Sequence, residues 1–317
     1  MRESKLDPHA GAIAEALDDG VSQRDLAKRY GVSRSTLQNW IKTRTSIVPE
    51  AARWHAGDDL SEDPEDSYTE IPVIVRDYSH LKELYVYPLG DVHKGSSAHA
   101  GKRWQQWLDY LVTTPNTSML GTGDFFNAAL KDSKSESYDE VMTVKQAREE
   151  LSDDMKPLAD QGRVDLLIPG NHEARIYRAC GDDPVSAIAR ELDIPYVAEA
   201  AVVLYIVGDV AYEVFVRHGT GGGQVGARAN RLAQQARSII CDVYVSGHTH
   251  SSLAFPQDVF VVNRRLARVE RKRQLFVSSG SFVQYEGYAA KAGYAPQKIG
   301  APRIRLDGIK RDPHVSI

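Results

Sequence analysis

The chain has 317 residues, of which 42% are apolar, and its formal net charge at pH 7 is -4. This length allows one large domain and a small one, and the apolar fraction is ordinary for a globular protein with a sizeable core. The acidic balance argues against a uniformly basic nucleic-acid binder, but it is compatible with local basic patches.

The sequence contains no recognisable targeting or disulfide signal. No apolar stretch approaches the roughly 20 residues that span a bilayer, and no apolar segment follows the first charged residues as in a secretory signal. We therefore expect a cytoplasmic protein without membrane contact. Cys180 and Cys241 lie in separate segments without a CxxC motif, which excludes a disulfide framework and a thiolate zinc site.

A helix-turn-helix pattern occupies the N-terminal part of the chain. In the stretch VSRSTLQNWIKTR, Leu37, Trp40 and Ile41 recur at helical spacing and predict an inward-facing side. Ser33 is placed to cap this helix, and Gly31 allows the positive φ that a tight inter-helix turn requires. The pattern predicts a small all-α domain whose third helix presents its other side to solvent.

The outward side of this third helix predicts contact with DNA. Its side chains are of the types that hydrogen-bond base edges and phosphates. The alternative is a three-helix domain whose polar side is only hydrated. On the first interpretation, residues 1–46 form a DNA-binding helix-turn-helix domain, with candidate contacts at Arg34, Ser35, Gln38, Asn39 and Lys42.

An acidic segment follows this domain. From His55 to Glu70 the sequence has seven Asp and Glu residues and no Lys or Arg, with Pro64 inside the run. Such composition is typical of a solvated linker, although an acidic segment can also compete with DNA for a basic helix. We assign residues 47–79 to an acidic linker and residues 80–317 to the domain that follows it.

Strand-like apolar runs alternate with helical patterns in residues 80–317. The clearest helical pattern covers residues 144–158, and another covers residues 224–240. The later strands follow one another closely, which indicates antiparallel pairs in addition to parallel ones. We expect a mixed α/β domain with strands near residues 84–89, 118–123, 164–170, 202–207, 212–218, 242–248 and 275–280.

Polar residues follow five of these apolar runs, each beside a glycine that permits a sharp turn and a close approach of backbone. A single Asp or His at a strand end is more often a cap or turn residue, but capping does not explain five such ends. Because adjacent strand ends open into one crevice, the side chains can converge there. The candidates are Asp91, His93, Asp124, Asn171, His172, His218, His248 and His250.

A crevice that holds carboxylates, an amide and several imidazoles requires positive charge between them. Divalent metal ions supply that charge, and a donor set of aspartate and histidine without thiolates suits Mn, Fe, Zn or Ni. The number of candidate ligands exceeds the need of one ion. The sequence therefore predicts two divalent ions that share a carboxylate.

The ordered motifs GDVH, GDFFN, GNHE, His218-Gly219 and GHTH resemble those of the calcineurin-like metallophosphoesterase superfamily, over about residues 84–281. The resemblance implies a four-layer α/β/β/α sandwich, preceded here by the small all-α domain. It also implies two bound metal ions, with manganese expected, and His172 as a non-ligating general acid. By the same resemblance, Asp91, His93, Asp124 and His250 hold the first ion, and Asp124, Asn171, His218 and His248 hold the second.

The resemblance implies a phosphoric ester hydrolase in which a metal-bridging hydroxide attacks phosphorus and His172 protonates the leaving oxygen. Asn127 and Ala128 stand where protein Ser/Thr phosphatases of the family have an Asp-Arg pair, which disfavours a phosphoprotein substrate. The GDFF form is more similar to the nuclease branch, and the layout resembles phage phosphoesterases. We expect a phosphodiesterase or nuclease that acts on nucleic acid.

Two other functions remain open: a phosphoesterase on small or cyclic nucleotides, and a DNA-binding regulator with a non-catalytic metal site. The basic stretch NRRLARVERKR, residues 263–273, favours nucleic acid if it follows a phosphate backbone, but it is equally typical of a solvated hairpin. The sequence leaves the substrate, the DNA site and the oligomeric state undetermined.

Overall fold

The structure is a computed structural model that describes residues 4–6, 9, 12–13, 23–44, 71–129, 140–221, 225–263, 267–285 and 296–317. The chain divides into two compact units. The first comprises residues 1–67 together with residues 209–211, and the second comprises the remainder. No helix within the described ranges is both long enough and apolar enough to cross a membrane.

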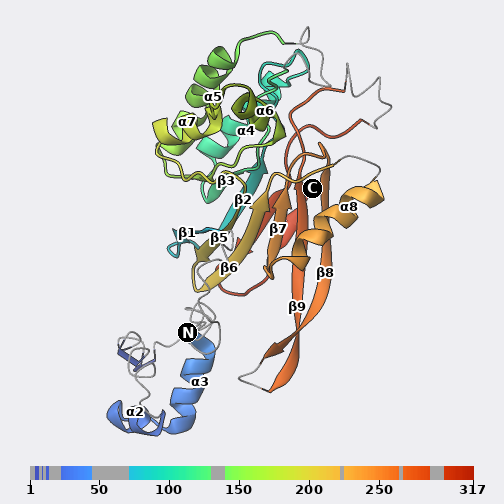
Figure 1. Cartoon of the computed structure of the whole chain (residues 1–317). Helices are drawn as coiled ribbons and strands as arrows, with labels where there is room; N and C mark the ends of the chain where they lie inside the picture. Colours follow the sequence, from blue (N-terminus) through green and yellow to red (C-terminus); the bar gives the residue numbers. More distant parts are fainter. Residues whose placement is uncertain are drawn as a thin grey trace, which may run out of the picture. The chain divides into compact units, whose positions relative to one another are not determined.

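The N-terminal unit contains α2 (Gln23–Arg29) and α3 (Arg34–Arg44), drawn in blue in Figure 1. Leu37 and Trp40 are buried in its small core, as predicted, whereas the side chain of Ile41 lies outside the described part. Ser33 Oγ accepts a hydrogen bond from the backbone N–H of Thr36 at 3.0 Å, so Ser33 caps α3. The turn before α3 contains a residue with φ of +61°, which is the predicted glycine at position 31.

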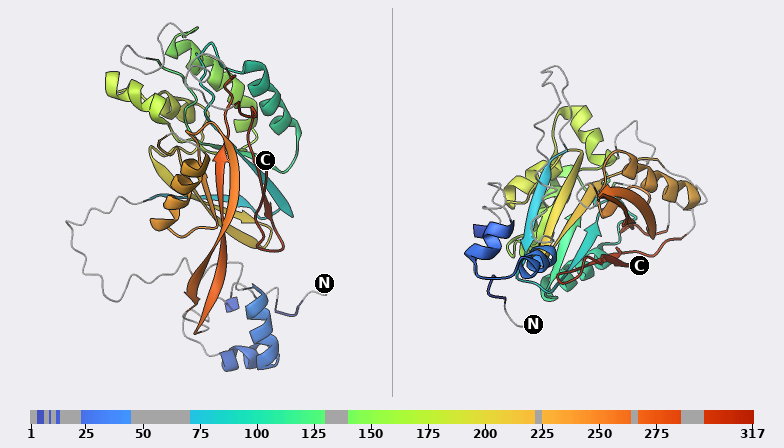
Figure 2. Two further views of the ribbon diagram at one scale, coloured as in Figure 1. Left: turned by 90° about the vertical axis from the view of Figure 1, so that its right-hand side faces the viewer. Right: turned by 90° about the horizontal axis from the view of Figure 1, so that it is seen from below.

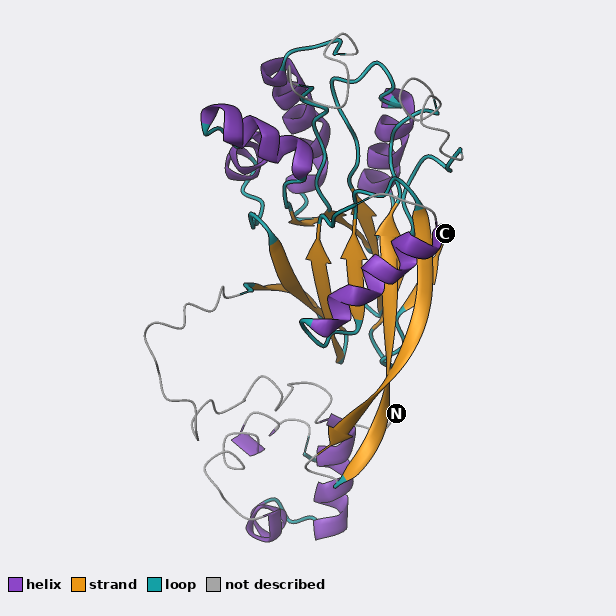
Figure 3. Cartoon of the chain, turned by 45° about the vertical axis from the view of Figure 1, so that its right-hand side comes forward, coloured by secondary structure: helices purple, strands orange, loops and turns teal. Residues whose placement is uncertain are grey.

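The second unit is a mixed α/β structure with two sheets and helices packed on them (Figures 1 and 3). Its five-stranded sheet has the order β11-β10-β2-β3-β4, and its six-stranded sheet has the order β1-β5-β6-β7-β9-β8. The strands are β1 (Val73–Tyr78), β2 (Glu83–Leu89), β3 (Thr117–Gly121), β4 (Val164–Leu166), β5 (Ala200–Val207), β6 (Val210–Arg217), β7 (Val243–Ser246), β8 (Ser252–Asn263), β9 (Arg268–Ser279), β10 (Arg303–Asp307) and β11 (His314–Ser316).

Three parallel strands form the part of the five-stranded sheet that leads to the candidate site. β2 pairs with β3 and β3 with β4, all in parallel, so their carboxyl ends lie at one edge. Amphipathic helices α4 (Gly101–Thr113), α5 (Val144–Ala159) and α7 (Pro184–Glu191) contribute buried side chains to the same hydrophobic core as β2 and β3. Thr143 caps α5 with a reciprocal Thr143–Gln146 pair, which explains where this helix begins.

The six-stranded sheet combines parallel and antiparallel pairs, in agreement with the predicted mixture. β6, β7 and β9 are parallel neighbours, whereas β8 and β9 form an antiparallel hairpin with 12 residues in each strand. Helix α8 (Val225–Gln234) and the short 3-10 helix η4 (Gln235–Arg237) pack over this sheet through Leu232, Tyr244 and Phe276. Figure 2 shows the long hairpin in two further views.

Four strands, β1, β8, β10 and β11, fall where no strand was expected. Residues 73–78 lie inside the predicted linker, but they form β1, which pairs in parallel with β5, so the linker ends by residue 72. The acidic run itself lies outside the described residues. The strand β8 contains Pro256, which has no backbone N–H to donate. Proline is tolerated there because β8 is an edge strand that pairs with a neighbour on one side only.

A buried polar cluster links strands of the two sheets. The carboxylate of Asp165 on β4 accepts hydrogen bonds from the hydroxyls of Tyr78 at 2.6 Å and Tyr205 at 2.8 Å, and from Nε of Arg76 at 3.0 Å. Burial raises the pKa of Asp165, and the neighbouring Arg76 charge opposes that rise. Because Arg76, Tyr78 and Tyr205 belong to β1 and β5, this cluster joins the six-stranded sheet to β4.

Candidate metal centre

The predicted site residues follow the carboxyl ends of β2, β3, β4, β6 and β7, and the fold brings them together. Three groups of metal-ligating side chains have their ligand atoms within 4.8 Å of one another. The sequence-based expectation that these strand ends converge is therefore met, although their separation along the chain reaches about 160 residues. The three groups are Asp91, His93 and His250; His93, Asp124 and His172; and Asp124, His218 and His248.

The backbone at these residues is held in the left-handed region. The φ angles are 48° at Asp91, 49° at His93, 53° at Asp124, 70° at His248 and 51° at His250. For residues other than glycine this conformation costs roughly 1–2 kcal/mol each. Such a concentration of strained backbone at one place is typical of a functional site.

Glycines allow the loops to approach one another closely. A Cβ on Gly170 would lie 2.1 Å from Oδ1 of Asp124, and a Cβ on Gly90 would lie 2.1 Å from Oγ1 of Thr122. Neither contact is sterically possible, so only glycine fits at these two positions. This explains the glycines beside the predicted ligands, which the sequence pattern attributed to close backbone approach.

The first group of donors comes from two loops. Asp91 and His93 lie in the loop that follows β2, and His250 lies in the β7–β8 loop. Nε2 of His93 lies 3.0 Å from Nε2 of His250, and Nε2 of His250 lies 3.3 Å from Oδ1 of Asp91. Asp91 also accepts hydrogen bonds from the backbone N–H of His248 at 2.9 and 3.0 Å, which orient its carboxylate. Two imidazole nitrogens and a carboxylate oxygen thus face one small volume.

The second group contains an amide as well as carboxylate and imidazole donors. Nε2 of His218 lies 3.1 Å from Oδ2 of Asp124 and 3.2 Å from Oδ1 of Asn171. Oδ1 of Asn171 is also 2.6 Å from Nδ1 of His248. This set of nitrogen and oxygen donors is suited to a divalent transition ion.

Asp124 lies between the two groups. Its Oδ2 atom is 3.1 Å from Nε2 of His218 on one side and 3.9 Å from Nε2 of His93 on the other. Its Oδ1 atom accepts a hydrogen bond from the backbone N–H of His172 at 2.9 Å, which fixes the carboxylate plane. Asp124 is therefore the residue placed to serve both donor groups.

Hydrogen bonds to Nδ1 of His218 and His93 fix the orientation of these two imidazole rings. Nδ1 of His218 lies 2.7 Å from the carbonyl oxygen of Thr122, which only accepts, so Nδ1 carries a hydrogen and Nε2 is the nitrogen that faces Asp124 and Asn171. Nδ1 of His93 similarly faces Oδ1 of Asn127 at 3.3 Å. Both imidazoles are therefore oriented toward the donor groups, and the residues present are of the types that can hold a divalent metal ion.

Burial and mutual interaction strongly perturb the ionisation of the site. Burial lowers the pKa of His93, and the nearby His172 and His250 lower it further. Burial alone would raise the pKa of Asp124 and lower that of His218. The attraction between the two residues outweighs burial. It holds the pKa of Asp124 well below its usual range and raises that of His218 to about 10. The buried carboxylate is thus ionised and needs cationic partners.

His172, the predicted general acid, lies at the edge of the donor groups. Its Nε2 atom is 3.9 Å from Oδ2 of Asp124, and its Nδ1 atom donates to the carbonyl oxygen of Asn127. Nε2 then accepts a hydrogen bond from Nη2 of Arg175 at 3.1 Å. Burial lowers the pKa of His172. The sequence interpretation missed Arg175, which stands one helical turn after His172 on α6 (Asn171–Cys180).

Glu173 is a second residue that the sequence interpretation missed. It is buried, and its carboxylate accepts hydrogen bonds from the backbone N–H groups of Gly170 at 2.6 Å, Phe126 at 2.8 Å and Asp124 at 3.1 Å. Burial and the neighbouring Asp124 raise the pKa of Glu173 to about 7. A Glu three residues after a helix N-cap is the spacing that signals such a contact.

We expect Glu173→Gln to destabilise the protein. An amide has one acceptor oxygen, whereas the carboxylate has two. Its NH2 group would face a backbone N–H group that needs an acceptor. That buried N–H group would be left unsatisfied, at a cost of about 1–3 kcal/mol. Chemical denaturation should show this loss in the free energy of unfolding. Glu191→Gln, at an exposed position of α7, is the matched control and should change little. Equal stabilities of the two variants would contradict the role assigned to Glu173.

The candidate DNA contacts lie on α3, in the unit separate from the metal centre. Arg34, Ser35, Gln38 and Asn39 are exposed there, and Nε2 of Gln38 donates to Oε1 of Gln23 at 3.3 Å. The side chain of Lys42 lies outside the described part of α3. The exposed side of α3 is therefore polar.

Comparison with known families matches the N-terminal unit. Residues 11–46 match the homeodomain-like domain family. No curated protein matches the chain. A match to residues 11–46 is consistent with the helix-turn-helix prediction.

Solved structures give weak similarities. A predicted phosphoesterase from Streptococcus pneumoniae TIGR4 is 13% identical, covering 71% of this chain and 84% of its own, with a TM-score of 0.33. A Vps29 double mutant from Entamoeba histolytica is 16% identical, covering 74% and 98%, with a TM-score of 0.33. GAP50, the anchor in the inner membrane complex of Plasmodium, is 13% identical, covering 73% and 88%, with a TM-score of 0.37. Similarities at this level carry no argument about activity.

Proposed function

We propose that the chain is a dinuclear metal-dependent phosphoesterase of the calcineurin-like type, acting on phosphodiesters of nucleic acid. The observation that carries this proposal is the position of Asp124, whose Oδ2 atom lies between His218 at 3.1 Å and His93 at 3.9 Å. One carboxylate shared by two nitrogen-rich donor groups is the arrangement that a two-metal hydrolytic site needs.

The proposal assigns the first ion to Asp91, His93, Asp124 and His250, and the second to Asp124, Asn171, His218 and His248. When bound, two divalent ions, with Mn²⁺ the expected pair, supply Lewis-acid charge for phosphoryl oxygens and lower the pKa of water. We also infer the four-layer α/β/β/α arrangement, which is supported by α4, α5 and α7 on the five-stranded sheet and α8 on the six-stranded sheet.

The protein's own side chains have further parts in this mechanism. His172 donates a proton from Nε2 to the leaving oxygen, while its Nδ1–H bond to the Asn127 carbonyl holds the ring in place. Protonation of Nε2 requires the guanidinium of Arg175 to leave that nitrogen. Arg175 is then free to contact a phosphoryl oxygen beside the site, because guanidinium groups pair well with such oxygens.

A nucleic-acid substrate is supported by the homeodomain-like match at residues 11–46 and by the exposed polar side chains of α3. We propose that α3 contacts duplex DNA through Arg34, Ser35, Gln38, Asn39 and Lys42. The alternatives are hydrolysis of small or cyclic nucleotides, and DNA binding with a metal centre that does not catalyse.

A substrate panel separates these possibilities. With Mn²⁺, we expect the full chain to hydrolyse bis(4-nitrophenyl) phosphate and DNA, and to hydrolyse 4-nitrophenyl phosphate more slowly. Activity confined to the monoester would contradict the nuclease assignment, and activity confined to cyclic nucleotides would favour the first alternative. Duplex binding that weakens with salt and no hydrolysis of any ester would favour a regulator.

A further inference from the structure

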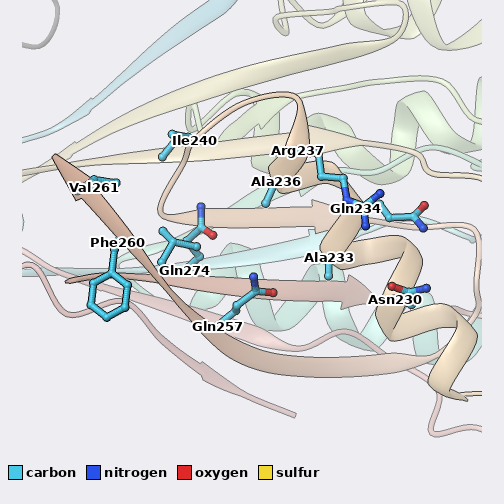
Figure 4. Close-up of a pocket in the computed structure, with 11 residues that line it drawn as sticks. Asn230, Ala233, Gln234, Ala236, Arg237, Ile240, Gln257, Phe260, Val261 and Gln274 are labelled. Atoms are coloured by element: carbon cyan, nitrogen blue, oxygen red, sulfur yellow. The ribbon is translucent and has the colours of Figure 1, made fainter. Parts of the chain in front are cut away.

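A groove lies between α8–η4 and the outer half of the β8–β9 hairpin (Figure 4). It encloses a cavity of about 360 Å³. Polar side chains line it on both sides: Asn230, Gln234 and Arg237 on the helical side, and Gln257 and Gln274 on the strands. No part of the mechanism proposed above uses this groove.

The segment that forms the groove is strongly basic. Residues 225–279 contain nine Arg and Lys and three Asp and Glu, a local charge of +6 in a chain whose net charge is -4. Arg271 and Arg273 share the single carboxylate of Asp258, at 3.6 and 3.2 Å. Among the described residues, Arg237 has no carboxylate within ion-pair distance. Among the described residues that line the groove, Arg237 is the one basic side chain, and it is placed to meet a phosphate of a polyanion.

Gln274 contributes an unused acceptor. Its side chain is buried, and its Nε2 atom donates to the hydroxyl of Tyr244 at 2.6 Å and to the carbonyl of Cys241 at 3.3 Å. The Tyr244 hydroxyl itself donates to the carbonyl of Ile239, so it can only accept from Gln274, which fixes the amide orientation. Oε1 of Gln274 then accepts no hydrogen bond from any described residue. This oxygen has almost no exposed surface, so a ligand donor in the groove can reach it only if the side chains around it move apart.

Exposed apolar side chains flank the polar ones. Phe260 is 78% exposed and Ile240 is 59% exposed, and both line the groove. An exposed aromatic ring beside arginine and amide side chains matches the needs of an unstacked base, which requires a stacking surface, a phosphate contact and hydrogen-bond partners. The bases of a closed duplex are stacked on one another and offer no ring face to Phe260.

The groove is also within reach of the candidate metal centre along the chain. β8 begins at Ser252, two residues after His250, and Gln257 lies five residues further along the strand. At about 3.3–3.4 Å per residue, the stretch from Ser252 to Gln257 spans about 17 Å, and the two residues from His250 to Ser252 add to it. A strand of nucleic acid held at the groove can therefore extend to the metal centre.

We propose that this groove binds single-stranded nucleic acid, with Phe260 stacking on a base and Arg237 contacting phosphate. Delivery of that strand to the metal centre rests on the proposed function, whereas binding does not. The groove thus makes single strands the substrate class of the chain.

The binding test uses the full chain in EDTA, with fluorescence anisotropy of labelled 12-nucleotide DNA and RNA single strands. Phe260→Ala should weaken binding at least about fivefold, the lower range for loss of one stacked base. Arg237→Ala should weaken binding and reduce the slope of log Kd against log salt by about 0.7, as for one phosphate contact to a single strand. Weakening with either strand type supports the proposal, and the tighter strand identifies the ligand.

Matched controls remove trivial explanations. Ile309→Ala truncates an apolar side chain of similar exposure, and Arg190→Ala removes an exposed arginine from α7. Both should bind single strands as the wild type does. Unchanged affinity in the two groove variants, equal loss in the controls, or equally effective displacement by unlabelled duplex would overturn the proposal. A groove variant that changes only the elution volume of the protein would instead indicate a second copy as the occupant.

The same experiment distinguishes failure of this inference from failure of the proposed function. Because chelation prevents metal-dependent cleavage, binding is measured without hydrolysis. If wild-type protein hydrolyses no ester but the groove variants still lose single-strand binding, the phosphoesterase proposal fails and the groove proposal stands. If the wild type hydrolyses the diester but the groove variants bind single strands normally, the groove proposal fails and the phosphoesterase proposal stands.

Discussion

Asp124→Asn is expected to abolish both metal binding and hydrolysis of bis(4-nitrophenyl) phosphate. The amide keeps an oxygen for the backbone N–H of His172, but it presents a neutral NH2 group to His218 or His93 in place of a shared carboxylate oxygen. The loss of activity should exceed the roughly 10–100-fold that substitutions of outer-shell residues cost in metal sites. Steady-state kinetics with added Mn²⁺ measure it.

The substitution is conservative in structure, which makes the result interpretable. Asn tolerates the positive φ of 53° at this position as well as Asp does, so the loop need not rearrange. Asp153→Asn, at an exposed position of α5, makes the same chemical change away from the site and should retain full activity. An active Asp124→Asn enzyme, at the same Mn²⁺ concentration, would remove Asp124 from the site.

His172→Ala should retain metal and lose turnover in proportion to the difficulty of the leaving group. A general acid contributes about 10²–10⁴-fold in rate when the leaving oxygen needs a proton. Nitrophenolate is a stable anion and leaves without being protonated. The alkoxide of a nucleotide is a much stronger base and needs a proton to leave. We therefore expect a small loss on bis(4-nitrophenyl) phosphate and a large loss on DNA.

Parallel assays of the two substrates measure this difference. His314→Ala, at an exposed position of β11, is the matched control and should affect neither substrate. An equal loss of rate on both substrates would show that His172 positions or binds rather than donates a proton. Loss of bound metal in His172→Ala would instead make His172 a ligand.

The donor residues of the site were predictable because their signal is local. Each follows an apolar run and adjoins a glycine, and strand ends in an α/β sheet meet at one edge. The same reasoning predicted the α/β class and the capping of α3 by Ser33. The shared position of Asp124 was expected only from the resemblance of the motifs, because the pattern of strand ends alone does not show how loops from both sheets pack.

Other features were missed for identifiable physical reasons. Glu173 sits in the first turn of a helix, where an acidic residue is ordinary, so its three bonds to loop backbone were not apparent. Asp165 stands inside an apolar run, and only the pairing of β1 with β5 shows that Arg76 reaches it. β1 follows closely after the acidic run. Its Val73 and Val75 are exposed, so the strand is not a buried apolar run of the kind used to predict the others.

The metal stoichiometry of the full chain tests the central claim most directly. Chelator-treated protein would be titrated with Mn²⁺ in a calorimeter, and the metal content of the dialysed product measured by mass spectrometry. The account predicts two ions per chain in the wild type and recovery of diester hydrolysis as they bind. One ion or none per chain at saturating Mn²⁺, or hydrolysis that does not depend on added metal, would contradict it.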